Sequence, residues 1–124
     1  MKLLKYIDNE VYMLQLEKKV KGNLCTLGFD YGLVGTRYIS NIIMSIYKCP
    51  QLLHEICTQN LSVMAEEINK NNKAIDKNIR FAINNAYING ALSQVTIFKN
   101  NKPSLKQLIN WLYDFFICDD LFLY

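Results

Sequence analysis

The 124-residue sequence predicts an all-α fold, a compact bundle of about six helices that contains a helix-turn-helix. Helix breaks are sparse, because the chain has only two prolines and five glycines. Apolar residues recur at helical spacing in successive segments. The hydrophobic content of 51% can fill one core, and the length is too short for two ordinary domains. We therefore expect a single domain over residues 1–124, with a short N-terminal lead over residues 1–12.

A glycine-rich loop separates the first two predicted helices. The first helix runs from about Val11 to Leu27 and ends at Gly28, because a helix C-terminus favours a residue that can take a positive φ. The second covers about Thr36 to Lys48 and carries a stripe of isoleucines at helical spacing. Pro50 fits the first turn of a short third helix over Gln51 to Cys57, since its missing N–H costs nothing there.

The predicted helix-turn-helix lies at about residues 62–89. Its first helix begins near Ser62, and the polar run from Asn69 to Asn72 forms a tight turn, because asparagine tolerates left-handed backbone geometry. Its second helix runs from about Lys73 to Asn89, and Gly90 stands where a helix stop is expected. Two helices joined by so short a turn follow the helix-turn-helix plan.

One more helix is expected in the C-terminal part. Residues Gln94 to Lys102 are predicted to form a loop or a short extended piece. Ser104, which follows Pro103, caps a last helix that continues to about Ile117. No apolar run approaches the roughly 18 residues of a membrane span, so no membrane partner is expected.

The segment from Lys73 to Tyr87 separates into two faces on a helical wheel. The expected buried arc consists of Ile75, Ile79, Ala82, Ile83 and Ala86. The expected outward arc consists of Lys73, Lys77, Arg80, Phe81 and Asn84. Asp76 and Tyr87 lie at the border between the two arcs.

Positive charge is concentrated around this helix. Between Lys70 and Asn89 four cations stand against one aspartate, a net charge of +3 that equals the charge of the whole chain. Lysine and arginine can pair with phosphates or guanine, asparagine with adenine, and aspartate with cytosine. The expected DNA contacts are Lys70, Asn71, Asn72, Lys73, Asp76, Lys77, Arg80, Phe81 and Asn84, with Thr36 and Arg37 as weaker phosphate candidates. From the pattern alone, an ordinary bundle with a charged, solvated face is an equal alternative.

Three segments resemble a known family. MAEEINKNNKAIDKNIRFAINNAYINGAL (64–92) is similar to the C-terminal effector domain of the master sporulation response regulator, stage 0 sporulation protein A, of endospore-forming bacteria. LGFDYGLVGTRYISNIIMSIY (27–47) is similar to its loop and following helix, and NKPSLKQLINWLYDFF (101–116) to its last helix. The resemblance covers about residues 16–116, with the three segments in order at matching spacing.

This resemblance implies a six-helix domain that binds short promoter boxes in double-stranded DNA, often as tandem head-to-tail copies. By position, it implies that Lys73, Asp76, Lys77 and Arg80 touch bases and phosphates. The family's phosphorylated receiver domain has no room before Val11, so we expect a stand-alone effector domain in the cytoplasm.

Several positions depart from the family pattern. Ala74 replaces an arginine that reads DNA in the family, and Tyr87 replaces a tryptophan. The loop has Asp30, Gly32 and Val34 in place of a proline, a histidine and a lysine. The absence of a bidentate guanine donor at Ala74 predicts an altered box preference or weaker binding. A second hypothesis is therefore an interaction protein that pairs with a full-length response regulator and modulates it.

An enzyme, a metal site and a cofactor site are not expected. The lone histidine, His54, has no accompanying nucleophile pattern, and Asp119 and Asp120 are interpreted as a solvated helix end. No C-x-x-C pair is present, so the cysteines are interpreted as buried free thiols, with a disulfide left open. These cysteines are Cys25, Cys49, Cys57 and Cys118.

Overall fold

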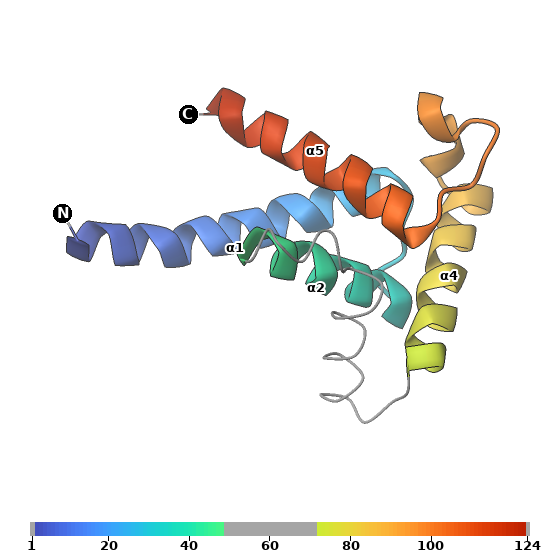
Figure 1. Ribbon diagram of the computed structural model, residues 1–124, viewed down its shortest axis with the longest axis horizontal. Coiled ribbons are helices and arrows are strands. Elements are labelled where there is room, and N and C mark those ends of the chain that lie inside the picture. Colours follow the sequence, from blue (N-terminus) through green and yellow to red (C-terminus); the bar gives the residue numbers. More distant parts are fainter. Residues whose placement is uncertain (1, 49–71, 124) are drawn as a thin grey trace.

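The computed structural model describes residues 2–48 and 72–123, and within these ranges the chain is helical without strands. It contains four α-helices and two short 3-10 helices (Figure 1). They are α1 (Lys2–Thr26), α2 (Val34–Lys48), α4 (Asn72–Asn89), η3 (Leu92–Gln94), η4 (Thr96–Phe98) and α5 (Leu105–Leu123). The all-α prediction is confirmed. The helices predicted over residues 51–57 and from Ser62, and the turn up to Asn71, lie outside the described residues, so the helix-turn-helix stays a prediction.

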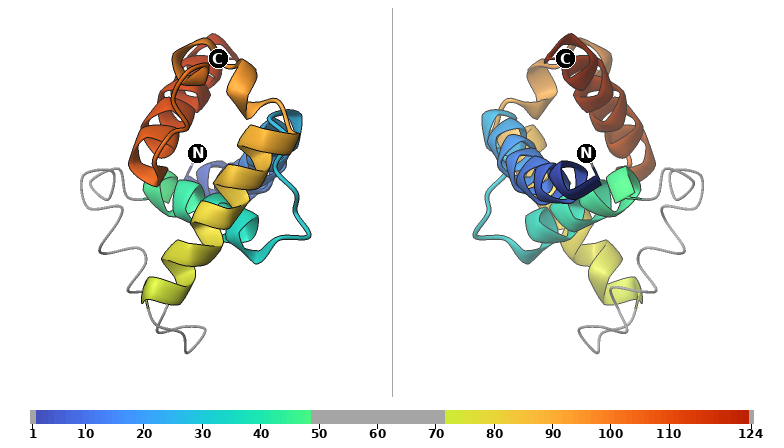
Figure 2. Two further views of the ribbon diagram at one scale, coloured as in Figure 1. Left: turned by 90° about the vertical axis from the view of Figure 1, so that its right-hand side faces the viewer. Right: turned by 90° about the vertical axis from the view of Figure 1, so that its left-hand side faces the viewer.

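Helix α4 crosses the ends of α2 and α5 instead of running beside them. In Figure 1, α1, α2 and α5 extend to the left from the region where α4 stands, and both chain ends lie on the left. Viewed from the right-hand side of Figure 1, α4 is the foremost helix (Figure 2, left). Its most extensive packing is against α2. One side of α4 therefore packs on the bundle, and the other side is directed away from it.

The core draws on all four α-helices. Helix α1 contributes Leu16, Val20 and Leu24, four residues apart and thus on one stripe. The buried apolar residues of the other helices are Tyr38, Ile39, Ile42, Ile43 and Ile46 from α2, Ile75, Ile79, Ala82, Ile83 and Ala86 from α4, and Leu105, Leu108, Ile109 and Leu112 from α5. Full burial of each large side chain stabilises the fold by about 1.5–3 kcal/mol. The orientation of α4 is therefore fixed by its apolar stripe.

Glycines permit two close approaches that fix α4 further. A Cβ atom at Gly35 in α2 would overlap the carbonyl oxygen of Asn78 in α4. Gly28, whose φ of 91° ends α1 as predicted, lies against Gly90 at the end of α4. The amide of Ala91 also donates to the carbonyl of Leu27 over 3.0 Å. The middle and the C-terminal end of α4 thus meet neighbouring backbone directly.

The loop between α1 and α2 is closed by its own polar groups. Asp30 Oδ1 accepts a hydrogen bond from the amide of Gly32 over 2.8 Å, a local turn in which the side chain mimics backbone. The ammonium group of Lys21 lies 5.3 Å from the centre of the Tyr31 ring. Burial raises the pKa of Tyr31 above its usual value, so its hydroxyl stays neutral in physiological buffers.

Both terminal helices are longer than predicted. Helix α1 begins at Lys2 instead of near Val11, so the expected lead is helical from Lys2 on, and α5 ends at Leu123 instead of near Ile117. Neither added stretch contains a glycine or a proline, and nothing in the sequence stops the helix there.

The segment predicted as a loop or extended piece over Gln94 to Lys102 is compact instead. Two 3-10 helices begin at Leu92 and Thr96, and Phe98 is buried with its ring edge-on to Trp111 at a centroid distance of 5.6 Å. The hydroxyl of Tyr87 donates to the carbonyl of Phe98 over 2.7 Å, and also lies 3.2 Å from that of Lys99. Burial of Phe98 therefore folds this segment back onto α4 and α5.

Candidate nucleic-acid interface

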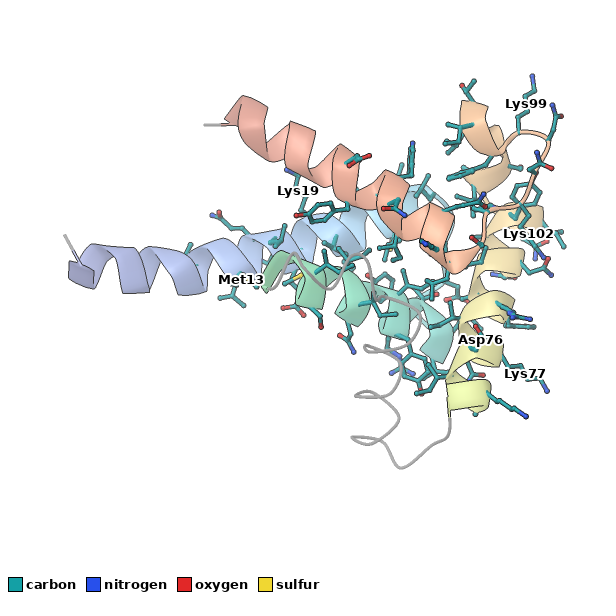
Figure 3. All side chains as sticks on the ribbon, in the orientation of Figure 1. Met13, Lys19, Asp76, Lys77, Lys99 and Lys102 are labelled. Atoms are coloured by element: carbon teal, nitrogen blue, oxygen red, sulfur yellow. The ribbon has the colours of Figure 1, made fainter. Side chains whose placement is uncertain are left out.

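The predicted division of α4 into two faces is confirmed. Every residue of the expected buried arc is at most 2% exposed. On the other side Lys73, Lys77, Arg80 and Phe81 are exposed, and Asn84 is half-buried. We call these five residues the outward face of α4. Figure 3 shows Lys77 directed away from the bundle, with Asp76 beside it on the same helix. The core thus holds the helix while its cations remain accessible to a ligand.

Arg80 and Asp76 form an ion pair on the outward side. The Arg80 Nε atom lies 2.9 Å from Asp76 Oδ2, one helical turn away, and the two side chains are 79% and 37% exposed. At such exposure the pair stabilises the helix by only a few tenths of a kcal/mol, about 0.3–0.5. Its main effect is geometric: the carboxylate occupies Nε and leaves the terminal nitrogens of the guanidinium as donors.

An apolar group lies among these cations. Phe81 is 60% exposed, and Ile88, two turns further along the helix, is 67% exposed. Single exposed apolar side chains are common on protein surfaces, and what distinguishes these two is that they lie seven residues apart and thus on one side of α4. An exposed aromatic ring can pack against the methyl group of thymine in a DNA groove.

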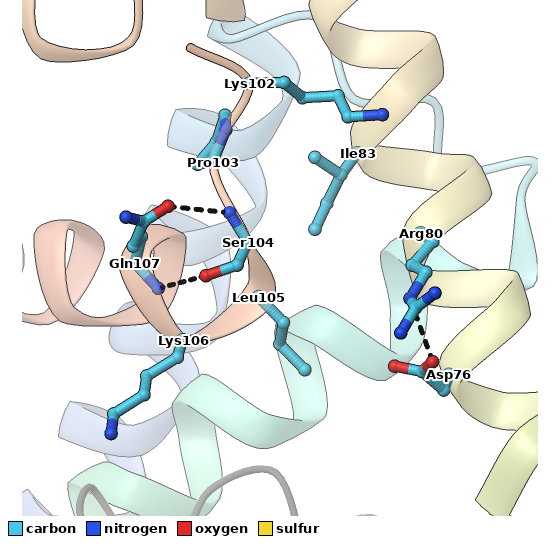
Figure 4. Close-up of a pocket in the computed structure, with 9 residues that line it drawn as sticks. All are labelled: Asp76, Arg80, Ile83, Lys102, Pro103, Ser104, Leu105, Lys106 and Gln107. Carbon is cyan, nitrogen blue, oxygen red and sulfur yellow. Dashed lines mark hydrogen bonds and ion pairs between the residues drawn. The ribbon is translucent and has the colours of Figure 1, made fainter.

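A groove that sequence reasoning missed borders the outward face. It lies between α4 and the start of α5 and encloses about 560 Å³ (Figure 4). Its lining residues are Asp76, Arg80, Ile83, Lys102, Pro103, Ser104, Leu105, Lys106 and Gln107. The Lys102 ammonium group donates to Asn84 Oδ1 over 3.1 Å and so reaches the outward face. The sequence signal was a pair of lysines on either side of the helix cap at Ser104.

The start of α5 confirms the predicted cap. The amide of Gln107 donates to Ser104 Oγ over 3.2 Å, and the amide of Ser104 donates to Gln107 Oε1 over 3.0 Å. This reciprocal pair is a capping box. It fixes the angle at which the chain enters α5 and therefore the place of the lysines on each side of it.

Of the two weaker phosphate candidates, Arg37 is exposed, whereas the prediction that Thr36 contacts phosphate is wrong. Thr36 is fully buried, and its hydroxyl has no hydrogen-bond partner in the described chain. Its position on the inner side of α2, next to Gly35, keeps the side chain from any phosphate. Lys70 and Asn71 lie outside the described residues, and Asn72 begins α4.

Two other expectations concern chemistry away from this surface. Cys25 is a free thiol as predicted, but it is exposed and not buried, because it lies outside the buried stripe of α1 that contains Leu16 and Leu24. Among residues 2–48 and 72–123 no group of three or more metal-ligating side chains comes together. No helix in those ranges has the length and apolar character required to cross a membrane.

An all-α domain with a cationic helix face directed away from its core has the arrangement that small DNA-binding domains use. The family described as the sporulation initiation factor Spo0A C terminal matches residues 20–115, and the chain therefore belongs to this family. The match includes α2, α4 and most of α5, and with them the outward face and the groove. It identifies a DNA-binding effector domain of the sporulation regulators. No curated protein matches the chain.

Proposed function

We propose that this protein is a transcription regulator that binds double-stranded promoter DNA sequence-specifically through the outward face of α4. The observation that carries the proposal is the exposure of Lys73, Lys77 and Arg80 on one side of a helix whose other side is core. An α-helix with cations on its free side matches the width and charge of the major groove. The protein would act by occupying DNA and not by catalysis.

The residues of the outward face divide by chemistry. Arg80 would donate its terminal nitrogens to guanine, while Asp76 orients it or accepts from cytosine. Lys73 and Lys77 would neutralise phosphates or reach guanine from the first turns. Phe81 would contact a thymine methyl, and Asn84 would pair with adenine.

The segment before α4 would complete the motif. We propose that α4 is the second helix of a helix-turn-helix whose first helix begins near Ser62, with Lys70 and Asn71 of the turn and Asn72 at the start of α4 on phosphates. The family resemblance implies tandem boxes occupied by two copies of the domain. Because Ala74 lacks the family's reading arginine, we expect its box to differ from the family's.

Random-oligonucleotide selection followed by sequencing tests this function. We expect one short motif to be enriched, and a mobility shift of the recovered duplex at physiological salt that a scrambled duplex of equal length does not give. A two-step shift on a duplex with two motif copies would support tandem occupancy. If no motif is enriched and no duplex shifts, while the protein co-purifies with a response regulator, the proposal is wrong and the role of an interaction protein replaces it.

A further inference from the structure

The groove between α4 and α5 carries more positive charge than its structural role requires. Three cationic side chains, Arg80, Lys102 and Lys106, line it against one carboxylate, a net charge of +2. That carboxylate, Asp76, already pairs with Arg80. Both lysines are exposed. Like charges that line one hollow repel each other in the free protein, so the arrangement suits an anionic ligand.

The rest of the lining is apolar on both sides, with polar groups only from Ser104 and Gln107 at the start of α5. Ile83 and Leu105 point into the space between the two helices in Figure 4, with Pro103 beside them. Two amides at the start of α5, those of Ser104 and Gln107, bond to side chains of the capping box. A ligand that fits must combine negative charge with an apolar body. The sugar-phosphate backbone of a nucleic acid has both.

The position of Lys102 connects this groove to the outward face. Its ammonium group is held by Asn84, a member of that face from the middle of α4, although 18 residues separate the two in sequence. Arg80 belongs both to the outward face and to the groove lining. The two surfaces are therefore continuous along one flank of α4, and one duplex can touch both.

We propose that Lys102 and Lys106 clamp the sugar-phosphate backbone of the same duplex that α4 reads, each lysine neutralising one phosphate. This inference rests on the proposed function. Lysine suits the task as a mobile point charge that needs no fixed hydrogen-bond geometry. The clamp carries no sequence information; it fixes the angle and register of α4 in the groove of the DNA.

The salt dependence of DNA binding tests the clamp. The probes are the duplex recovered by selection and its scrambled counterpart, titrated by fluorescence anisotropy at several salt concentrations. For the variant Lys102→Ala/Lys106→Ala, the slope of log K against log salt should shrink by about 0.9 for each phosphate that is no longer neutralised, roughly 1.8 in all. Affinity should fall by the same factor for both duplexes, so the ratio between them stays that of the unmodified protein.

Two control variants separate the clamp from a general decrease in charge. The variant Lys18→Ala removes one charge from an exposed position on α1, outside the groove, and should keep the full slope, in contrast to Lys106→Ala. The variant Lys102→Arg/Lys106→Arg keeps the charge and should restore it. Circular dichroism of each variant verifies folding, and Lys106→Ala alone, with about half the change in slope, serves if the double variant unfolds.

The outcomes distinguish the clamp from the proposed function. If the unmodified protein binds the selected duplex and the groove variant keeps its slope, the clamp is wrong and the function of α4 stands. The clamp is also wrong if the slope decreases as much in Lys18→Ala as in Lys106→Ala. If the unmodified protein prefers no duplex at all, the proposed function fails and the clamp fails with it.

Discussion

Arg80 is the residue of the outward face whose donor geometry is set most directly by a neighbour. Its Nε atom lies 2.9 Å from Asp76 Oδ2, a contact that favours one direction for the terminal nitrogens of the guanidinium. A free arginine would lose side-chain entropy on ordering at a base. The ion pair reduces that loss.

We predict that Asp76→Ala strengthens non-specific DNA binding and weakens the discrimination between DNA sequences. Removal of the carboxylate deletes one repulsion against DNA, so binding to a scrambled duplex should strengthen. Discrimination between selected and scrambled duplexes should fall by about 1–3 kcal/mol, the contribution of one well-aligned base pairing. Stability should change by only about 0.3–0.5 kcal/mol, because the pair is largely solvated. Anisotropy titrations measure the first two quantities, and unchanged discrimination would show that Asp76 has no part in reading.

Lys77 lies outside the groove lining and should behave differently. Its ammonium group is exposed on the first half of α4, with no carboxylate of the described chain paired to it. We predict that Lys77→Ala weakens binding to all duplexes and lowers the salt slope by about 0.9. Lys18→Ala on α1 is the matched control. A mobility-shift assay in which Lys77→Ala and the unmodified protein behave alike would remove Lys77 from the interface.

At the level of single elements, α4 was predicted accurately and the terminal helices less so. The start of α4 differs from the prediction by one residue, and its buried arc is confirmed. Both were predictable because apolar residues spaced at 3.6 residues per turn are visible in the sequence. The extra turns of α1 and α5 were not predicted, because these stretches contain neither a residue that stops a helix nor a clear apolar periodicity. Two 3-10 helices were missed because the burial of Leu92 in η3 and Phe98 in η4 depends on packing against the rest of the fold and not on local spacing.

The packing of α2 on α4 gives the clearest prediction for stability. Gly35→Ala places a methyl group into the Asn78 carbonyl, so α2 and α4 must separate, at a cost of about 1–3 kcal/mol. Gly22→Ala is the matched control, because its added carbon would meet no atom within 4 Å beyond the local backbone of its own helix, and it stands inside α1. That control should stabilise the fold by about 0.5–1 kcal/mol. Urea denaturation followed by circular dichroism compares them, and equal effects would contradict the close approach.

For the whole molecule, the sequence predicted the surface of one helix but not the assembly of the site. The candidate residues Lys73, Asp76, Lys77 and Arg80 share a helix, so periodicity alone places them together. Lys102 and Lys106 join them only because η3, η4 and the capping box return the chain to α4. Thr36 was wrong for a related reason: the packing of Gly35 against α4 turns this residue inward. Long-range packing of this kind cannot be read from local spacing.

The central claim is that duplex DNA binds on the side of the molecule formed by α4 and the start of α5. The most direct test is an NMR titration of isotope-labelled protein with the selected duplex, following each backbone amide. We predict that the largest shifts fall on the outward face between Lys73 and Asn84 and on residues 102–106, while α1 amides near Lys18 stay in place. Shifts confined to α1, or none along α4 at saturating DNA, would contradict the account.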